Sequence, residues 1–343
     1  MKKRHSALRL GAVALTAAVV ATLSTSASAT TRTVDLGVLP GGNTSFAFDV
    51  NDGGLVVGYS NNAAGANHAV LWDESGQITD LGTLPGDTAS TAYTVNDRGT
   101  VIVGRSLIPG QNQHPVKWTR DGAITALATP PGTTISRAYS VNNRGIAVGF
   151  ATGVDGVYKA LRWSGDGRAT QLAGLPGDPA AAAGWINNEG TVAGYSKNAA
   201  GSMSPVTWSP DGTVTRLTTP AGHDSAQASA ISDTGIAVGN SYTGTTSHAV
   251  RWSADGRLTE LAPLPGDTGA GAYGVNDSGT VIGFSTTADG LHRAVRWNPD
   301  GTITQLPGVT SGAAEAYGVN DFGATAGFST TADGKARSTV WKR

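Results

Sequence analysis

Nine histidine and aspartate side chains are the candidates for binding or catalysis in this sequence. Imidazole groups exchange protons near neutral pH and ligate metals, and carboxylates accept hydrogen bonds or hold cations. Four of the histidines lie four or five residues before a tryptophan, and the aspartates follow Leu-Pro-Gly or Pro-Ala-Gly-His segments. The candidate ligand-binding residues are His68, His114, His223, His248, His292, Asp87, Asp178, Asp224 and Asp267.

The regular placement of these residues also favours a structural interpretation. A histidine that recurs at a strand start is commonly a capping or packing residue, and aspartate after Pro-Gly often caps the turn through its own backbone. Lys159, Ser204 and Arg337 replace the histidine in other copies, and only His223 has no counterpart. The aspartates are Gly, Thr or Asn in the remaining copies, which argues against a uniform ring of metal ligands.

No known catalytic pattern is present in the sequence. There is no G-x-S-x-G, no H-E-x-x-H and no phosphate-binding glycine loop, and the Asn-Asp-x-Gly segments lack the distal glutamate of a calcium loop. Glycosidases need two carboxylates that flank one bond. On the predicted inner strands only Asp49 and Glu315 are acidic, at different places in their units. With His223 they are the only nominees for such chemistry, so a protein without enzymatic activity or cofactor is favoured.

The candidate residues are carried by a repeated unit. Seven tryptophans follow one another at intervals of 44 to 46 residues, and a turn asparagine and a strand glycine recur with the same period. Self-similarity at this period is typical of a repeat fold. The tryptophans are Trp72, Trp118, Trp163, Trp208, Trp252, Trp297 and Trp341, and packing between units is favoured over a sugar-stacking array.

Each unit is predicted to contain four short antiparallel strands. In the second copy these are 92–96, 100–106, 114–119 and 123–129, joined by Asn-Asp-Arg-Gly, a longer link, and Arg-Asp-Gly. Asn, Asp and Gly accept the positive φ angles of tight hairpin turns. No stretch after the leader shows a helical apolar period, and a repeated unit of four antiparallel strands is typical of a propeller blade.

The two ends of the chain complement each other. The seventh unit stops at 341–343 without a fourth strand, whereas 31–37 (TRTVDLG) resembles the fourth strand of a unit. Pairing the two would remove the free edges of the last blade. We therefore predict an all-β fold, a seven-bladed β-propeller with four antiparallel strands per blade, its ring closed by the N-terminal strand pairing in the last blade.

Two finer expectations follow from the alignment of the copies. The second copy has one extra residue between Asn96 and Gly104, and we expect it to form a β-bulge within 100–103. Five aromatic residues share one place on the inner strands, where packing is favoured over lining of a central channel. They are Phe48, Tyr93, Tyr139, Tyr273 and Tyr317.

The first residues predict export. A basic segment, an apolar run of about a dozen residues and a small-residue site ending at Ala29 form the layout of a secretory signal peptide over 1–29. The propeller is then a single domain over 30–343. Without the leader, 20 Lys and Arg face 25 acidic residues, which gives no electrostatic case for nucleic acid or membrane binding. We expect a secreted, extracellular monomer, and the absence of cysteine excludes disulfides.

The repeated motifs are similar to a known family. NHAVLW (67–72), SHAVRW (247–252) and the V-N-D-x-G segments resemble the bacterial HAF repeats, named for a His-Ala-Phe stretch and described as probable extracellular repeats. The resemblance covers residues 30–343, although valine replaces the phenylalanine here and several copies keep only the tryptophan. It implies export and a repeated β architecture, and it implies no catalytic residues.

The geometry of the predicted blades indicates where a partner would bind. Tight turns occupy one rim, so the longer links gather on the other, which we call the long-loop rim; examples are 60–68, 84–90, 106–114 and 151–159. These links differ most between copies, and function tends to lie on loops held by a rigid scaffold. The sequence favours a non-enzymatic module that binds an extracellular polysaccharide or protein through this rim. The alternatives are a secreted glycan hydrolase or lyase and a purely structural scaffold.

Overall fold

All regular structure between residues 31 and 342 consists of β-strands. The computed structural model describes these residues, and within them it contains no helix, as the sequence predicts. The described part therefore holds no helix that could cross a membrane. The predicted signal peptide, residues 1–29, lies outside the described residues.

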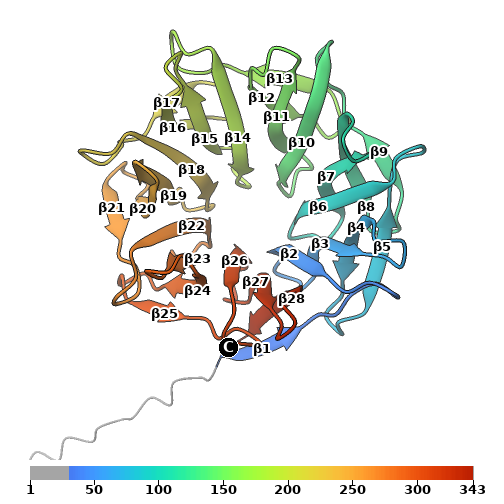
Figure 1. Cartoon of the computed structure of the whole chain (residues 1–343). Coiled ribbons are helices and arrows are strands. Elements are labelled where there is room, and N and C mark those ends of the chain that lie inside the picture. Colours follow the sequence, from blue (N-terminus) through green and yellow to red (C-terminus); the bar gives the residue numbers. More distant parts are fainter. Residues whose placement is uncertain (1–30, 343) are drawn as a thin grey trace, which may run out of the picture. The chain divides into compact units, whose positions relative to one another are not determined.

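Most strands form four-stranded antiparallel sheets that follow the chain order (Figure 1). One sheet contains β2 (Ser45–Val50), β3 (Val56–Asn61), β4 (Asn67–Trp72) and β5 (Ile78–Gly82). Others contain β14 (Ala180–Ile186), β15 (Val192–Lys197), β16 (Met203–Trp208) and β17 (Val214–Arg216); β18 (Ser225–Ile231), β19 (Ala237–Thr243), β20 (Thr246–Trp252) and β21 (Leu258–Leu261); and β22 (Gly269–Val275), β23 (Val281–Thr286), β24 (His292–Trp297) and β25 (Ile303–Gln305).

The second and third copies of the repeat share one larger sheet. It contains β6 (Ala89–Val95), β7 (Val101–Leu107), β8 (Gln113–Thr119) and β9 (Ile124–Ala126), followed by β10 (Thr133–Val141), β11 (Ala147–Gly153), β12 (Lys159–Trp163) and β13 (Ala169–Leu172). A single parallel pair, Ile135 with Gln113, joins the two groups of four strands. Within each group every pairing is antiparallel, as the tight turns require.

The last sheet combines both ends of the described chain. β26 (Ala314–Val319), β27 (Thr325–Thr330) and β28 (Ala336–Lys342) are followed at the edge by β1 (Arg32–Asp35), which pairs antiparallel with β28. The first strand of each group lies nearest the centre in Figure 1, and β26 contacts β2 as well as β22. The sheets thus present their inner strands to a common centre.

The asparagine that begins each tight turn serves two purposes. The Asn51 side-chain oxygen accepts the Leu55 amide at 2.9 Å and closes the turn, in which Gly54 takes a φ of 77°. Its side-chain nitrogen donates to the carbonyl oxygen of Asn96 in the neighbouring group at 3.0 Å. The same tie joins Asn142 to Asn187, Asn187 to Ser232, Asn276 to Asn320, and Asn320 to Asn51. The asparagine lies in the turn as predicted, but it acts through its side chain, because among the described residues only glycines take a positive φ. The structure also adds a link between sheets.

A bulge in each inner strand explains the recurring strand glycine. Between β2 and β3 the register passes from Ala47–Gly58 directly to Asp49–Val57, which leaves Phe48 unpaired. A Cβ atom on Gly58 would lie 1.8 Å from the Phe46 carbonyl oxygen, so only glycine fits opposite the bulge. The same register shift recurs in the other inner strands.

The extra residue of the second copy is not where the sequence predicted it. Pairing of β7 with β8 is uninterrupted from Val101 to Leu107, and its shift against β6 is the one that all inner strands share. The Asn96 amide instead reaches the Val101 carbonyl, so the turn itself is one residue longer. Thr100 and Val101 both donate their amides to the Asn96 side-chain oxygen. The prediction of a bulge within 100–103 was wrong because a surface turn accommodates an insertion at less cost than a paired strand.

The repeated tryptophans form the core between neighbouring sheets, as predicted. All seven are completely buried, and Trp118 packs against Leu55 and Leu71 of the preceding sheet. Trp72 likewise packs against Ala326 and Val340 of the last sheet. Several indole nitrogens donate to a link carbonyl, for example Trp163 to Ala128 at 2.6 Å. Burial at each junction fixes the inner strands, and with them the centre that they surround.

Candidate functional site

A cavity of about 610 Å³ lies between the inner strands. It falls within the usual size range of small-ligand sites, about 300 to 1,000 Å³. Each inner strand contributes the residue of its bulge, because the missing backbone pairing turns that residue out of the ladder. These residues are Phe48, Tyr93, Tyr139, Gly184, Ser229, Tyr273 and Tyr317.

Five of the bulge residues form a continuous arc of aromatic rings. The ring centroids of Tyr139 and Tyr93 lie 5.1 Å apart, and those of Tyr93 and Phe48 lie 5.4 Å apart. Phe48 is 5.5 Å from Tyr317, which stacks on Tyr273 at 4.9 Å. These are favourable aromatic contact distances. The sequence favoured packing over channel lining for these residues; the structure corrects this, because the rings contact one another and also form the cavity wall.

The opposite side of the cavity is built from small residues. Gly184 and Ser229 replace the ring in two successive inner strands, and Ala182, Ala183 and Gly194 lie beside them. The missing ring volume opens the cavity on this side. Trp185, the eighth tryptophan, which lies outside the repeat series, and Tyr195 complete this wall.

Burial raises the pKa values of four tyrosines that line the cavity. It raises the pKa of Tyr93 to about 12, against the lowering effect of Arg105 and Arg137, and it raises the pKa of Tyr195 to about 12. The pKa values of Tyr273 and Tyr317 are also raised, first by burial and then by the charge of Glu315. Their hydroxyl groups therefore stay protonated at physiological pH and can donate hydrogen bonds.

One cation faces the cavity. Arg137 lies two residues before the bulge residue Tyr139, and its Nε donates to the Gln113 side-chain oxygen at 2.9 Å. Arg105 donates from Nη1 to the same oxygen, also at 2.9 Å. The guanidinium carbon of Arg137 lies 5.8 Å from the ring centre of Phe150, a cation–π contact. None of the residues that line the cavity is Asp, Glu or His.

The cavity extends to the long-loop rim on one side. Tyr158 belongs to the link 151–159, lines the cavity and contacts the Phe150 ring at 4.9 Å. In the same link Val154 is 96% exposed. Val154 lines a separate, smaller cavity beside Pro131 and Lys159 and does not line the central one.

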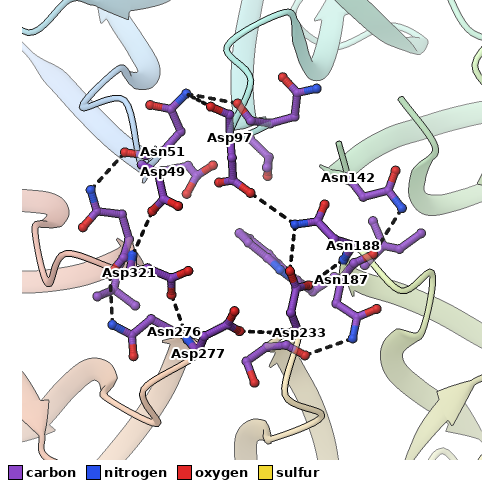
Figure 2. A pocket seen from close by; sticks show the side chains of 18 of the residues that line it. Asp49, Asn51, Asp97, Asn142, Asn187, Asn188, Asp233, Asn276, Asp277 and Asp321 are labelled. Atoms are coloured by element: carbon purple, nitrogen blue, oxygen red, sulfur yellow. Dashed lines mark hydrogen bonds between the residues drawn. The ribbon is translucent and has the colours of Figure 1, made fainter. Parts of the chain in front are cut away.

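A second, narrower cavity of about 100 Å³ lies at the level of the tight turns (Figure 2). It shares Thr94 and Trp185 with the larger cavity. We call the acids and amides that follow the turn asparagine the Asx belt: Asp52, Asp97, Asn143, Asn188, Asp233, Asp277 and Asp321. Figure 2 shows most of these side chains around the opening.

Backbone amides link the Asx belt from sheet to sheet. The Asp321 amide donates to Asp52 Oδ1 at 2.9 Å, and the Asp277 amide donates to Asp321 Oδ1 at 2.9 Å. The series continues from Asp233 to Asp277, from Asn188 to Asp233 and from Asn143 to Asn188. The side-chain nitrogens of Asn143 and Asn188 both donate to Asp97 Oδ2, at 3.0 and 3.2 Å. No group of the described acids has the arrangement of a metal site.

Three acids at this narrow mouth have raised pKa values. Burial raises the pKa of Asp49 to about 7, although its Oδ2 accepts the Val95 amide at 3.1 Å. Burial, followed by the charges of neighbouring belt acids, also raises the pKa values of Asp52 and Asp277.

The nine predicted site residues lie outside both central cavities. His114 contacts Asp87 at 3.2 Å, and the rings of His223 and His248 lie 4.7 Å apart. The others are held separately: His68 by Asp80, His292 by Glu315, Asp178 by Ser196, Asp224 by the Gly244 amide, and Asp267 by Ser285. Ligand binding by these nine residues stays a prediction, and their contacts match the structural interpretation.

The aspartates of the links between units do not make the contacts that we expected. We expected Asp87, Asp178 and Asp267 to cap their own turns, but their carboxylates reach across to other strands. Asp178 Oδ2 accepts the Ser196 hydroxyl at 2.7 Å, and Asp267 Oδ2 accepts the Ser285 hydroxyl at 2.7 Å. Both serines lie at the end of a second strand, so each aspartate fastens the link between units to the next sheet.

The three nominees for glycan cleavage do not meet. Asp49 lines the narrow mouth, whereas Glu315 and His223 line neither central cavity. Glu315 is engaged by His292 at 2.8 Å and by the Tyr317 hydroxyl at 2.9 Å. His223 contacts Ser241 at 2.9 Å.

Sequence reasoning missed Arg137 and the layer to which it belongs. The residue two positions before each bulge changes from copy to copy: Phe46, Thr91, Arg137, Ala182, Gln227, Gly271 and Glu315. Three of them, Arg137, Ala182 and Gln227, line the cavity. Variation at one place of an otherwise regular inner strand is the sequence signal for this layer.

The sequence matches no protein-family model and no curated protein. Solved structures share its fold. A streptogramin B lyase has a TM-score of 0.58 at 16% identity over 91% of this chain and 97% of its own. Virginiamycin B lyase from Staphylococcus aureus has a TM-score of 0.59 at 15% identity over 92% and 99%. A structure assigned to TolB from Agrobacterium tumefaciens has a TM-score of 0.52 at 12% identity over 88% and 99%.

These similar structures are β-propeller proteins, and the likeness assigns the β-propeller fold to the described residues. At such low identity it assigns no activity, because one fold supports many functions.

Proposed function

We propose that the protein is an exported, non-enzymatic binding module that takes its ligand into the central cavity from the long-loop rim. Export is proposed from the leader 1–29, with its basic start and apolar run. The proposed location is extracellular, and the protein is proposed to act as a monomer without a cofactor or a nucleic acid partner.

The proposed scaffold is a closed ring of seven blades. Its closure is supported by β1 at the edge of β28 and by the tie from Asn320 to the Asn51 carbonyl at 3.0 Å. The Ser338 amide also donates to the Ser45 hydroxyl at 3.0 Å. A closed ring would hold the cavity wall rigid and so lower the entropic cost of binding.

The observation that carries the proposed function is the aromatic cavity of about 610 Å³. Ring faces, hydroxyl groups and one guanidinium converge on it, which is the composition of a ligand site. A polysaccharide chain suits it better than a folded protein surface, because the cavity is concave and is enclosed by inner strands.

The test uses Trp185, which lines the cavity and therefore reports on its occupation. The purified protein is titrated with a panel of soluble oligosaccharides while tryptophan fluorescence is recorded. We expect a saturable change for at least one oligosaccharide, and we expect the Trp185→Phe variant to keep binding by calorimetry while losing the fluorescence change. Saturable binding that leaves Trp185 unaffected would place the ligand elsewhere and contradict the proposal.

The same mixtures are analysed for products after incubation. We expect the bound oligosaccharide to be recovered intact. Turnover that is lost in variants of cavity residues would replace the binding module with the alternative, a glycan hydrolase or lyase.

A further inference from the structure

We propose that the central cavity recognises an acidic saccharide, with the carboxylate of a uronic acid residue bound by Arg137 and the sugar ring placed on the aromatic arc. This inference rests on the proposed function, since it names the ligand class of the same cavity.

The first argument is the unbalanced charge at Arg137. Within residues 31–342, no carboxylate lies within ion-pair distance of Arg137 or of its neighbour Arg105. Both donate to one neutral acceptor, the Gln113 side-chain oxygen, at 2.9 Å. Both arginines are half-buried, and a charged group that is partly removed from water gains from a partner of opposite charge. An anion from outside the chain would supply the missing partner.

The second argument is the orientation of the guanidinium. Its Nε is held by Gln113, its Nη1 lies 3.5 Å from the Tyr139 hydroxyl, and Phe150 lies against one side at 5.8 Å. A planar guanidinium fixed in this way matches a planar carboxylate, which it binds through two parallel hydrogen bonds. A spherical ion would not need this orientation.

The third argument is the chemistry of the remaining wall. The aromatic arc offers ring faces for the C–H face of a sugar, and the neutral tyrosine hydroxyls can bind its oxygens. On the opposite side Gln227 and Ser229 add an amide and a hydroxyl. The described residues place no carboxylate in the wall that would repel the ligand's negative charge. The wall therefore combines groups for a polyhydroxylated ring with a single anion-binding group.

The experiment compares matched ligands on the purified protein by calorimetry. The probes are trisaccharides of galacturonate, glucuronate and mannuronate, each with its neutral twin of galactose, glucose or mannose, and one sulfated trisaccharide. We expect at least one uronate trisaccharide to bind ~10-fold or more tightly than its neutral twin, as a charge-assisted hydrogen-bonded pair would provide.

The variants separate charge recognition from folding. Arg137→Gln is expected to weaken binding of the uronate trisaccharide ~10- to 100-fold and to leave the affinity for its neutral twin unchanged. Arg137→Lys is expected to recover part of the lost affinity. If Arg137→Gln does not fold, Arg105→Gln is the second variant. We expect it to weaken binding of the same uronate trisaccharide. Arg168→Gln is the matched control, because Arg168 is 84% exposed and pairs with Asp166.

Four results would overturn the inference. Equal affinity for each acidic and neutral pair, or equal losses for both in Arg137→Gln, would remove the carboxylate assignment while leaving the binding module in place. Tighter binding of the sulfated trisaccharide would assign the site to sulfate esters. A panel in which no saccharide binds would overturn this inference, and a further blank against cell-envelope fractions and secreted proteins would overturn the proposed function as well.

Discussion

At the scale of single residues, Asp49 shows how the fold changes the chemistry of a side chain. The residue lies on the inner strand β2, is 5% exposed and reaches the Val95 amide of the neighbouring sheet. From its sequence context it is one more acid near a turn. Burial between two sheets raises its pKa to about 7, so this carboxyl group titrates near neutral pH.

The stability of the protein should therefore decrease as pH rises. Burial raises the pKa of Asp49 from 3.8 to about 7, so between these values the folded state holds a proton that the unfolded state has released. Protonation favours folding below this window, and that contribution is lost as pH rises through the folded pKa. We expect the free energy of unfolding to fall by up to about 4 kcal/mol between pH 4 and 8.

Denaturant unfolding at several pH values measures this dependence. Asp49→Asn removes the titrating group and keeps an oxygen for the Val95 amide, so its profile should be flatter over the same range. Asp73→Asn, a change at an exposed turn acid, should leave the decrease in place. A wild-type profile that rises from pH 4 to 8 would contradict the assignment.

At the scale of the strand pair, the bulge and the strand glycine together produce the cavity. Gly58 lies opposite the bulge at Phe48, where the backbone of β2 approaches too closely for any side chain. The unpaired residue then turns its ring toward the centre. The bulge recurs in each copy, and five of the bulge residues are aromatic and form one wall of the cavity. The two bulge residues without a ring, Gly184 and Ser229, leave the other side open.

Replacing the strand glycine should disturb both stability and the site. In Gly58→Ala the new methyl group would meet the Phe46 carbonyl oxygen at 1.8 Å, so the strands must separate. We expect a loss of about 3 kcal/mol or more in the free energy of unfolding, measured by denaturant titration. Gly165→Ala is the control, since its nearest heavy atom would lie 3.9 Å away. Equal stability of the two variants would show that the close approach is not required.

At the scale of the whole molecule, the ends of the described chain lie in one sheet. β1 covers the edge of β28, and the Leu36 amide donates to the Ser338 carbonyl at 3.0 Å. Without β1, the backbone groups of β28 along this edge would lack partners, and free edges promote association between chains. The N-terminal strand therefore belongs to the last sheet, although it is the first segment of the described chain.

Removal of residues 31–37 should weaken the last sheet. Partial burial of Val34 and Leu36 contributes about 2 to 4 kcal/mol, so we expect a lower unfolding temperature and self-association at high concentration. Calorimetry and light scattering measure the two effects. A synthetic peptide of residues 31–37 should restore the unfolding temperature, whereas a scrambled peptide should not. An unchanged unfolding temperature after the deletion would contradict the proposed ring closure.

Much of the architecture follows from the sequence alone, because its signals are local. Asn-Asp-x-Gly turns specify hairpins within a few residues, and the tryptophan period reports one core position per unit. These signals predicted antiparallel strands, buried tryptophans and a fold without helices, and residues 31–342 show all three features. The position of the extra residue near Thr100 was predicted wrongly. It depends on whether the turn or the following strand accommodates the insertion at lower cost, and residue spacing does not distinguish the two.

The candidate site was decided by tertiary structure. The sequence directed attention to His68, Asp87 and similar repeated residues, and the structure gives these local partners away from the centre. Arg137 became a candidate only when its cavity position was known, together with its lack of an acidic partner among residues 31–342. Both depend on where other strands lie, since a channel is formed by residues from every inner strand at once. The sequence by itself determined the repeating unit, because that unit is stabilised locally; only the assembly determined which side chains share a cavity.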